Sequence, residues 1–193
     1  MTIQHEQWIS LEEYHEIERT SEIKYEYIDG RIYAISGCTF EHSQIAINTL
    51  VALATHLRGK VCRVVNSDMK VLPLDDENPS YHPDVTVTCN PDDYKHDSTI
   101  IRSPRLLVEV LSPSTEYKDR GKKLRDYQAC PSVEEYAMIS TRYQQVEIFY
   151  RTGEVWTYRQ FTAGQEVTLI SMDLTLPISS IYEDTAIPEQ EEM

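Results

Sequence analysis

The chain has 193 residues, 40% of them hydrophobic and 26% charged, which is typical of one globular domain with a buried core. No apolar run approaches the roughly 20 residues that a membrane span requires, and the N-terminus lacks the basic start and apolar run of a signal peptide. These features favour a cytoplasmic protein without a membrane partner.

The net charge of −14 argues by itself against nucleic acid as a partner. The acids concentrate at the two ends, however: residues 1–29 carry a net charge of −6 and residues 183–193 carry −5, which leaves −3 for the body. Within the body, Lys118–Arg125 holds five bases and one acid. This run fits either a solvated helix face or a surface that contacts phosphate groups.

The N-terminal part predicts a helix, a hairpin and a longer helix. Ser10 followed by Glu13 is a capping box, which starts a helix over 10–20. Two alternating strands over 24–36 flank Asp29-Gly30, the strongest short hairpin signal. A helix is expected from His42 to Arg58, with Gly59 as its stop. Its apolar residues recur at helical spacing, at Ile47, Leu50, Val51, Ala54 and Leu57.

The rest of the chain predicts strands with one further helix. Three strands are expected over 61–72, 84–89 and 105–111, separated by loops over 75–83 and 90–104. They are followed by a helix from Ser114 or Thr115 to Gln128, a strand over 135–139, and a hairpin of 144–150 and 154–161 around Thr152-Gly153. We predict one domain over 1–193, α/β or α+β, with a mixed sheet, helices on its faces and a frayed acidic tail over 183–193.

The four cysteines are widely spaced and form no CxxC pair. We expect reduced, mostly buried thiols rather than a zinc site or a disulfide framework. The residues concerned are Cys38, Cys62, Cys89 and Cys130.

Two acids occur in consecutive predicted strands, on faces that match. If the strands 84–89 and 105–111 are adjacent and antiparallel, Asp84 at the start of one lies beside Glu109 near the end of the other. Two close carboxylates repel each other unless a cation lies between them, and Mg²⁺ accepts one or two carboxylates beside water and substrate phosphate. We therefore predict a Mg²⁺ site, with Mn²⁺ as a substitute. The alternatives are a loop acid at Asp84 and a salt-bridged glutamate at Glu109.

Pro83-Asp84, an apolar strand carrying Glu109 and a basic helix together resemble the PD-(D/E)xK nuclease superfamily. More closely, the chain resembles the Uma-type (Uma-two) restriction endonuclease family, in the segments KYEYIDGRIYAISG, EHSQIA, SDMKV, PDVTV and LLVEVLSPST followed by DRGKKLRDY. The resemblance spans Lys24–Tyr127 and continues through the next strand. It implies a restriction-endonuclease-like core, with a mixed central sheet flanked by helices and extra N- and C-terminal β-hairpins. It also implies that Asp84 and Glu109 are catalytic metal ligands.

The catalytic lysine departs from the superfamily pattern. In (D/E)xK a lysine stands two residues after the acid, and that position is Leu111 here. Lys123 matches the family's D-R-G-x-K, so the resemblance implies that it supplies the amine from the next helix, with Lys122 as the fallback.

Several other polar residues are weaker candidates. Glu41 or His42 resembles the family's EH pair and is either an outer ligand of the metal or a helix cap. Asp68 either supports the site or is a polar residue at a sheet edge. Glu26 is expected on the hairpin surface, and His82 is a further candidate ligand.

These residues favour a Mg²⁺-dependent endonuclease that hydrolyses phosphodiester bonds in nucleic acid, with DNA favoured. Fold-level analogy adds a homodimer as an expectation. Two alternatives stay open. One is an inactive binding or oligomeric module on the same fold, favoured by the acidic ends and Leu111; the other is a metal-dependent hydrolase of a smaller phosphorylated substrate.

Overall fold

The structure is a computed structural model that describes residues 8–35, 37–74 and 78–190. Its centre is a six-stranded mixed sheet, in which β7 and β8 are parallel and the other neighbours are antiparallel. From edge to edge the sheet contains β10 (Val155–Thr162), β9 (Gln145–Thr152), β8 (Glu135–Ile139), β7 (Pro104–Val110), β5 (Val85–Thr88) and β3 (Arg63–Asn66). The predicted α+β class with a mixed central sheet is confirmed.

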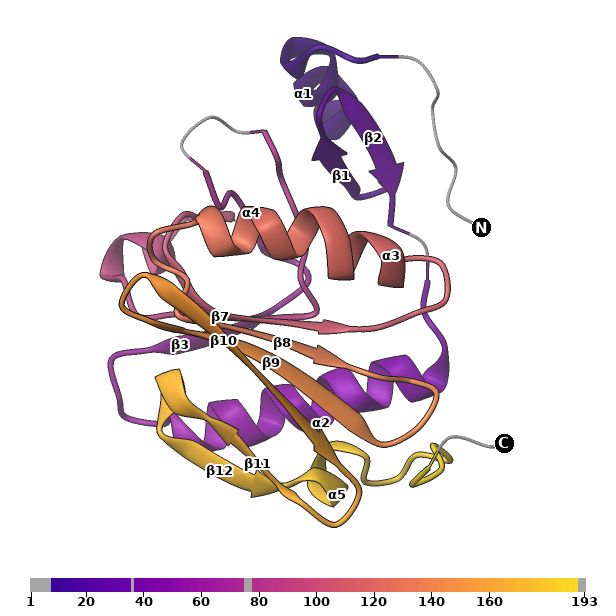
Figure 1. The fold of residues 1–193 in the computed structure, drawn as a ribbon. Coiled ribbons are helices and arrows are strands. Elements are labelled where there is room, and N and C mark those ends of the chain that lie inside the picture. The colour runs from indigo at the N-terminus through magenta and orange to yellow at the C-terminus, as the bar shows by residue number, and fades with distance from the viewer. Residues whose placement is uncertain (1–7, 36, 75–77, 191–193) are drawn as a thin grey trace.

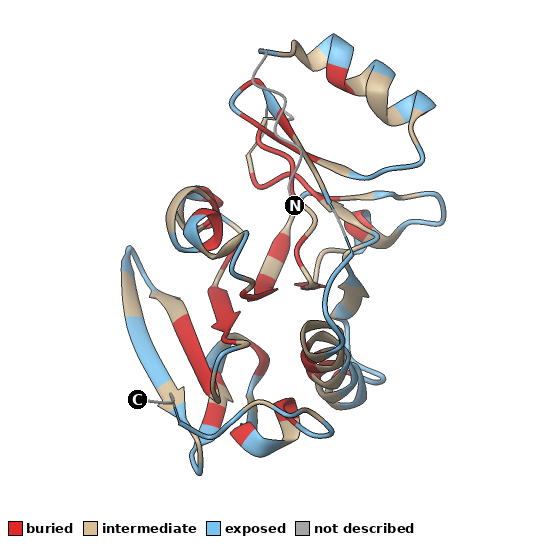
Figure 2. Ribbon diagram, turned by 90° about the vertical axis from the view of Figure 1, so that its right-hand side faces the viewer, coloured by how far each residue is buried: buried red, intermediate tan, exposed pale blue. Residues whose placement is uncertain are grey.

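Helices cover both faces of this sheet. Helix α2 (Phe40–His56) lies against one face, and a continuous helical segment lies against the other (Figure 1). That segment consists of α3 (Glu116–Lys118), the π-helical turn η2 (Asp119–Lys123) and α4 (Leu124–Ala129). Buried residues concentrate in the central strands and on the inner sides of the helices (Figure 2). The core is therefore two apolar layers, one on each side of the sheet.

Helix α2 forms where its apolar spacing predicts it, but only part of that apolar surface is buried. Ile45, Leu53 and Leu57 pack against the sheet, whereas Ile47 and Val51 are about half exposed, at 51% and 54%. Apolar residues occur on more than one side of this helix, so spacing alone does not identify the side that meets the core.

The N-terminal elements pack together above the α3–α4 face of the sheet (Figure 1). They are α1 (Leu11–Thr20), β1 (Tyr25–Ile28) and β2 (Arg31–Ala34). Both hydrogen bonds of the predicted capping box are present, and the turn residues Asp29 and Gly30 have φ of 50° and 77°, as a two-residue hairpin turn requires. Tyr14 of α1 stacks on Tyr27 of β1 with ring centroids 4.7 Å apart.

Two predicted segments are more divided than expected. The strand predicted over 61–72 is split into β3 and β4 (Lys70–Val71), and β4 pairs in parallel with β6 (Ile100–Ile101). β6 and the short 3₁₀ helix η1 (Pro91–Tyr94) lie in the loop predicted over 90–104. Elements of two to four residues are too short to produce a hydrophobic period.

The C-terminal region adds elements that were not predicted. They are β11 (Glu166–Leu169), the 3₁₀ helix η3 (Ile170–Met172), β12 (Leu174–Pro177) and α5 (Ile178–Ile181). Of the acidic tail, residues 183–190 follow the α2 side: Ala186 N donates to Glu41 Oε2 (3.0 Å), and Gln144 N donates to the carbonyl of Pro188 (2.8 Å). Residues 191–193 lie outside the described residues.

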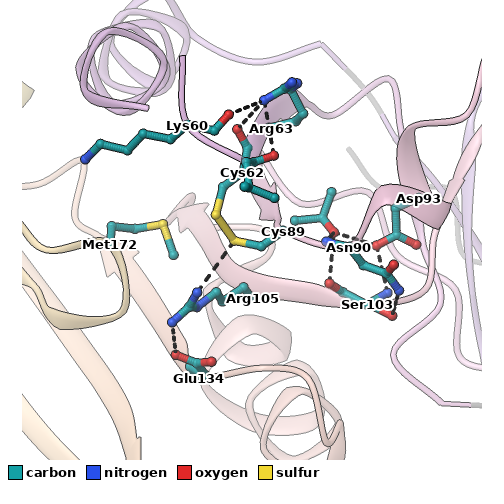
Figure 3. Close-up of a disulfide and its surroundings, with 12 residues drawn as sticks. Lys60, Cys62, Arg63, Cys89, Asn90, Asp93, Ser103, Arg105, Glu134 and Met172 are labelled. Carbon is teal, nitrogen blue, oxygen red and sulfur yellow. Dashed lines mark hydrogen bonds and ion pairs between the residues drawn. A yellow bond between two sulfur atoms is a disulfide. The ribbon is translucent and has the colours of Figure 1, made fainter. Parts of the chain in front are cut away.

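The expectation of four reduced cysteines is wrong for two of them. Cys62 and Cys89 form a disulfide (Figure 3). Cys62 directly precedes β3 and Cys89 directly follows β5, and the pairing of Arg63 with Thr88 places the two cysteines opposite each other. This register cannot be read from the spacing of 27 residues in the sequence. Cys38 is exposed and Cys130 is buried, both as free thiols.

We expect reduction of this disulfide to destabilise the protein. Closing a loop of this length lowers the conformational entropy of the unfolded chain, which corresponds to about 3.5 kcal/mol of unfolding free energy. Urea unfolding with and without reductant measures the loss. The variant with Cys62→Ala and Cys89→Ala should show a similar loss and no further response to reductant, whereas a wild-type stability indifferent to reductant contradicts the prediction.

Candidate functional site

Asp84 and Glu109 come together as their strands predict. β5 and β7 are adjacent and antiparallel, with Val85 paired to Val108. Asp84 directly precedes β5, and its Oδ2 accepts a hydrogen bond from Val110 N at 2.7 Å, on the residue that follows Glu109. The Glu109 side chain is on the face of β7 that also buries Leu107 under α4, opposite the face that packs on α2. The two acids thus occupy one end of a strand pair in the middle of the sheet.

Lys123 reaches this strand pair from the helical segment above it. Its Nζ lies 2.9 Å from Glu109 Oε1, 2.8 Å from Glu26 Oε1 and 3.2 Å from Asp119 Oδ1. Asp119 and Lys123 are the first and last residues of the π-helical turn η2. Such turns are rare and occur often at functional sites. The turn η2 carries both charged side chains that the helical segment places beside Glu109, those of Asp119 and Lys123.

The cluster contains more negative than positive charge. Three carboxylates, those of Glu26, Glu109 and Asp119, contact the ammonium of Lys123, and the charge of Asp84 also interacts with this group. The side chains of Lys123 and Glu109 are only 5% and 6% exposed, so water screens these charges little. An isolated buried charge would be very costly, and this arrangement persists only because the charges lie next to one another.

Burial and the excess of negative charge shift the pKa values of Glu109, Asp84 and Lys123. Burial raises the pKa of Glu109 well above its usual range, and the neighbouring Lys123 only partly opposes that effect. Burial also raises the pKa of Asp84, against the opposing influence of His42. For Lys123 burial acts to lower the pKa, but the attraction of Glu109, Glu26 and Asp119 outweighs it and raises the pKa well above its usual range. The lysine therefore stays charged, whereas Glu109 and Asp84 are protonated more readily than exposed carboxyl groups because their pKa values are raised.

Tyrosines hold these groups in place. The hydroxyl of Tyr127 donates to Glu109 Oε1 at 3.0 Å, and the hydroxyl of Tyr136 donates to the Asp119 carbonyl at 3.2 Å. Tyr81 presents its ring to Lys123, with Nζ 5.5 Å from the centroid. All three tyrosines are fully buried. They leave Glu109 and Lys123 little freedom to rotate away from each other.

The donor set suits an ion that takes few protein ligands. Within the described part of the chain, no three His, Cys, Asp or Glu side chains converge on one point as a closed metal cage would require. Mg²⁺ commonly uses one or two carboxylates and completes its coordination with water and phosphate. Asp119 Oδ1 is buried without a hydrogen-bond partner among the described residues, although Lys123 is close enough for an ion pair. The surplus of carboxylate oxygens is consistent with a place for a divalent cation.

The remaining candidates separate into those near the cluster and those away from it. His42 Nε2 lies 3.4 Å from Asp84 Oδ2, whereas Glu41 turns to Ala186, and the helix cap that either was expected to provide is made by Thr39. Lys122 pairs with Asp126 at 2.9 Å rather than with Glu109.

Two further candidates contact other groups. Asp68 is 69% exposed and pairs with Lys24 and Asn66, and His82 is hydrogen-bonded to the Ser67 carbonyl at 3.0 Å.

Two members of the cluster were missed by sequence reasoning. Glu26 was expected on the hairpin surface, which is wrong: it is 8% exposed and bonded to Lys123. Ile28 is apolar and lies on the same face of β1 as Glu26, and this was the available signal that the face meets the core. Asp119 was not among the candidates from the sequence, and its side chain and that of Lys123 are both buried.

Comparisons with known proteins identify the family of the chain and two similar proteins. Residues 11–180 match the model of the Uma2 family, described as "Putative restriction endonuclease". A protein of Synechocystis sp., uncharacterized protein slr1290, is 36% identical over 179 residues, covering 92% of this chain and 93% of its own. A second, uncharacterized protein sll1609, is 26% identical over 147 residues, covering 76% and 82%.

A solved structure from Anabaena variabilis shares the fold. It is described as a "putative nuclease belonging to DUF820" and matches with a TM-score of 0.71 at 19% identity, covering 90% of this chain and 97% of that one. At this identity the similarity concerns the fold.

In the described residues, no helix is long and apolar enough to cross a bilayer.

Proposed function

This chain belongs to the Uma2 family, and on that premise we propose that it is an endonuclease that hydrolyses phosphodiester bonds in nucleic acid, with DNA as the favoured substrate and Mg²⁺ or Mn²⁺ as cofactor. Asp84 and Glu109 would hold the metal, and Lys123 would assist. The observation that carries the proposal is that Lys123 lies 2.9 Å from Glu109 within an excess of acids, since Glu26 and Asp119 contact the same ammonium. In the (D/E)xK pattern the lysine follows the acid on the same strand, at the position of Leu111. Here the lysine beside Glu109 comes from the helical segment instead.

Each residue of the cluster has a distinct role in this proposal. Lys123, held charged by its carboxylate neighbours, donates hydrogen bonds to the attacking water or to a phosphate oxygen. Tyr127 orients Glu109 through its hydroxyl, and His42 lies against Asp84 on the side of α2. Glu26 and Asp119 position Lys123. A metal ion bound at the two strand acids would lower the pKa of its water and withdraw charge from the phosphate.

Cleavage of supercoiled plasmid tests the proposal. Purified protein should nick or linearise plasmid with Mg²⁺ or Mn²⁺ and not with EDTA, and the variant with both Asp84→Ala and Glu109→Ala should be inactive. Cutting that survives in this variant would come from a contaminant and would overturn the proposal. Parallel reactions with RNA and with free nucleotides distinguish a polynucleotide substrate from a smaller phosphorylated one. Inactivity on all of them would favour a binding module.

A further inference from the structure

A basic surface cavity lies between the N-terminal hairpin and the helical segment α3–η2–α4. Its volume is about 520 Å³. We call it the hairpin–helix cavity. It is lined by Ile28, Asp29, Arg31, Tyr33, Tyr117, Lys118, Gly121, Lys122 and Arg125.

This cavity is the neighbour of the carboxylate cluster, because the same two elements build both. In the helical segment, Asp119 and Lys123 turn to the cluster, and Lys118 and Lys122, each one residue earlier, turn to the cavity. In the hairpin, Glu26 of the cluster is paired across the two strands with Tyr33 of the cavity lining. The same side of the hairpin therefore contributes to the cluster and to the cavity. Lys118, which lines the cavity, directly precedes Asp119, whose carboxylate lies 3.2 Å from Lys123 Nζ in the cluster.

The cavity differs in charge from the rest of the molecule. Its lining holds four cationic side chains and one acid, in a chain whose net charge is −14. Lys122 lies 3.4 Å from Asp29, and Lys118 Nζ is 3.6 Å from the ring centroid of Tyr33. A cleft lined by one sign of charge raises the local concentration of oppositely charged ligands.

Two of the four cations are unpaired. Arg31 and Arg125 are exposed, and neither has an ion-pair or hydrogen-bond partner in the part of the chain that the structure describes. Arg120, on the same helical segment but outside the cavity lining, is instead bonded to Glu116 at 2.8 Å and to Glu147 at 2.5 Å. The guanidinium groups at the cavity thus keep their donors for a ligand, and guanidinium matches phosphate oxygens in a bidentate manner.

An aromatic ring stands at the same cavity. Tyr117 is 78% exposed, the most exposed of the large hydrophobic side chains in the described chain. Aromatic rings beside a basic groove are the usual platform on which bases of a nucleic acid stack.

We propose that the hairpin–helix cavity binds the nucleic-acid backbone beside the cleaved bond, with Arg31 and Arg125 contacting phosphates and Tyr117 stacking on a base. The proposal rests on the proposed nuclease function for the identity of the ligand. It also accounts for the basic run Lys118–Arg125: one of its lysines serves the cluster, while Lys118, Lys122 and Arg125 line the cavity.

Binding measured without cleavage tests this proposal. The probes are a fluorescein-labelled 20-nucleotide single strand and the corresponding duplex, titrated in EDTA and followed by fluorescence anisotropy over a range of salt concentrations. The variant with Arg31→Ala and Arg125→Ala should bind about tenfold or more weakly, and the slope of log K against log salt should fall by about one per arginine removed. A variant with Arg58→Ala and Arg159→Ala, two exposed arginines outside the cavity, removes the same charge and should bind nearly as the wild type does.

A steric test uses the glycine of the lining. A Cβ built on Gly121 meets no atom within 4 Å, so the position accepts a side chain that would project into open space. Gly121→Trp should weaken binding of both probes by about tenfold by filling the cavity, whereas Gly121→Ala should not. Tyr117→Ala should weaken the single strand more than the duplex, because only unpaired bases offer free faces for stacking.

The outcomes separate this proposal from the nuclease function. Wild-type protein that binds neither probe, or an Arg31/Arg125 variant that keeps wild-type affinity and salt slope, would overturn the cavity proposal even if the plasmid is cut. Equal losses in the Arg58/Arg159 control would overturn it as well. Arginine-dependent binding without any cutting would leave the cavity proposal standing and refute the nuclease function.

Discussion

Glu109→Gln is expected to lower metal-dependent cleavage by on the order of 10²–10³-fold while the protein stays folded. Glutamine keeps the size of Glu109 and can still accept the hydrogen bond of Tyr127. It removes the charge that we assign to the metal, so turnover should fall even at high metal concentration. Asp84→Asn should act in the same direction. Initial rates of plasmid cleavage against Mg²⁺ or Mn²⁺ concentration provide the measurement.

The matched control is Glu135→Gln on the adjacent strand β8. Glu135 is as buried as Glu109, but it accepts hydrogen bonds from Ile170 and Ser171 and is not part of the Lys123 cluster. Its substitution should change stability and leave the cleavage rate of the folded enzyme nearly unchanged. Equal losses of rate in the two variants would mean that folding and not the metal site explains the effect.

Lys123→Met is expected to destabilise the protein by about 3–5 kcal/mol at pH 8. The substitution leaves the buried carboxylates of Glu109, Glu26 and Asp119 without their shared cation. Lys122→Met is the control, because Lys122 is partly exposed. Its partner Asp126 still accepts the hydrogen bond from the Tyr81 hydroxyl when the lysine is removed. We expect a cost of about 0–1 kcal/mol there. Urea unfolding of both variants tests the difference.

The cost of Lys123→Met should shrink as the pH falls. Burial raises the pKa of Glu109 in the folded state above its value in the unfolded chain, so its contribution to stability is present at low pH and is lost as the pH rises through the folded value. Without the lysine that pKa rises further, and the loss extends to higher pH. The difference in unfolding free energy between wild type and variant should therefore increase from pH 5 to pH 8. A difference that is constant across this range would contradict the assignment.

Local sequence signals predicted the parts of the fold that depend on neighbouring residues. The capping box at Ser10, the turn at Asp29-Gly30 and the alternation of β5 and β7 are short-range patterns. The alternation put Asp84 and Glu109 on matching faces, and their meeting was predicted on the condition that the two strands are adjacent and antiparallel, which they are. The choice of Lys123 over Lys122 as the candidate amine came from the family resemblance, and Lys123 is the one of the two that contacts Glu109. The homodimer and the cytoplasmic location stay predictions.

The features that were missed depend on how distant segments meet. The pairing of Cys62 with Cys89 follows from the register of β3 on β5, and the burial of Glu26 follows from the hairpin's packing on the helical segment. The π-helical turn that aligns Asp119 with Lys123 departs from the regular helical period, so a search at 3.6 residues per turn cannot find it.

The contribution of Glu26 from the N-terminal hairpin has a consequence for how the site is assembled. About 100 residues separate Glu26 from Lys123, so the two charges meet only after a long loop has closed at an entropic cost. During synthesis the hairpin emerges before β7 and the helix exist. A chain that lacks the N-terminal residues through β2 would lose Glu26, one of the lysine's three partners. The cluster is therefore complete only when the N-terminal hairpin has docked on the helical segment.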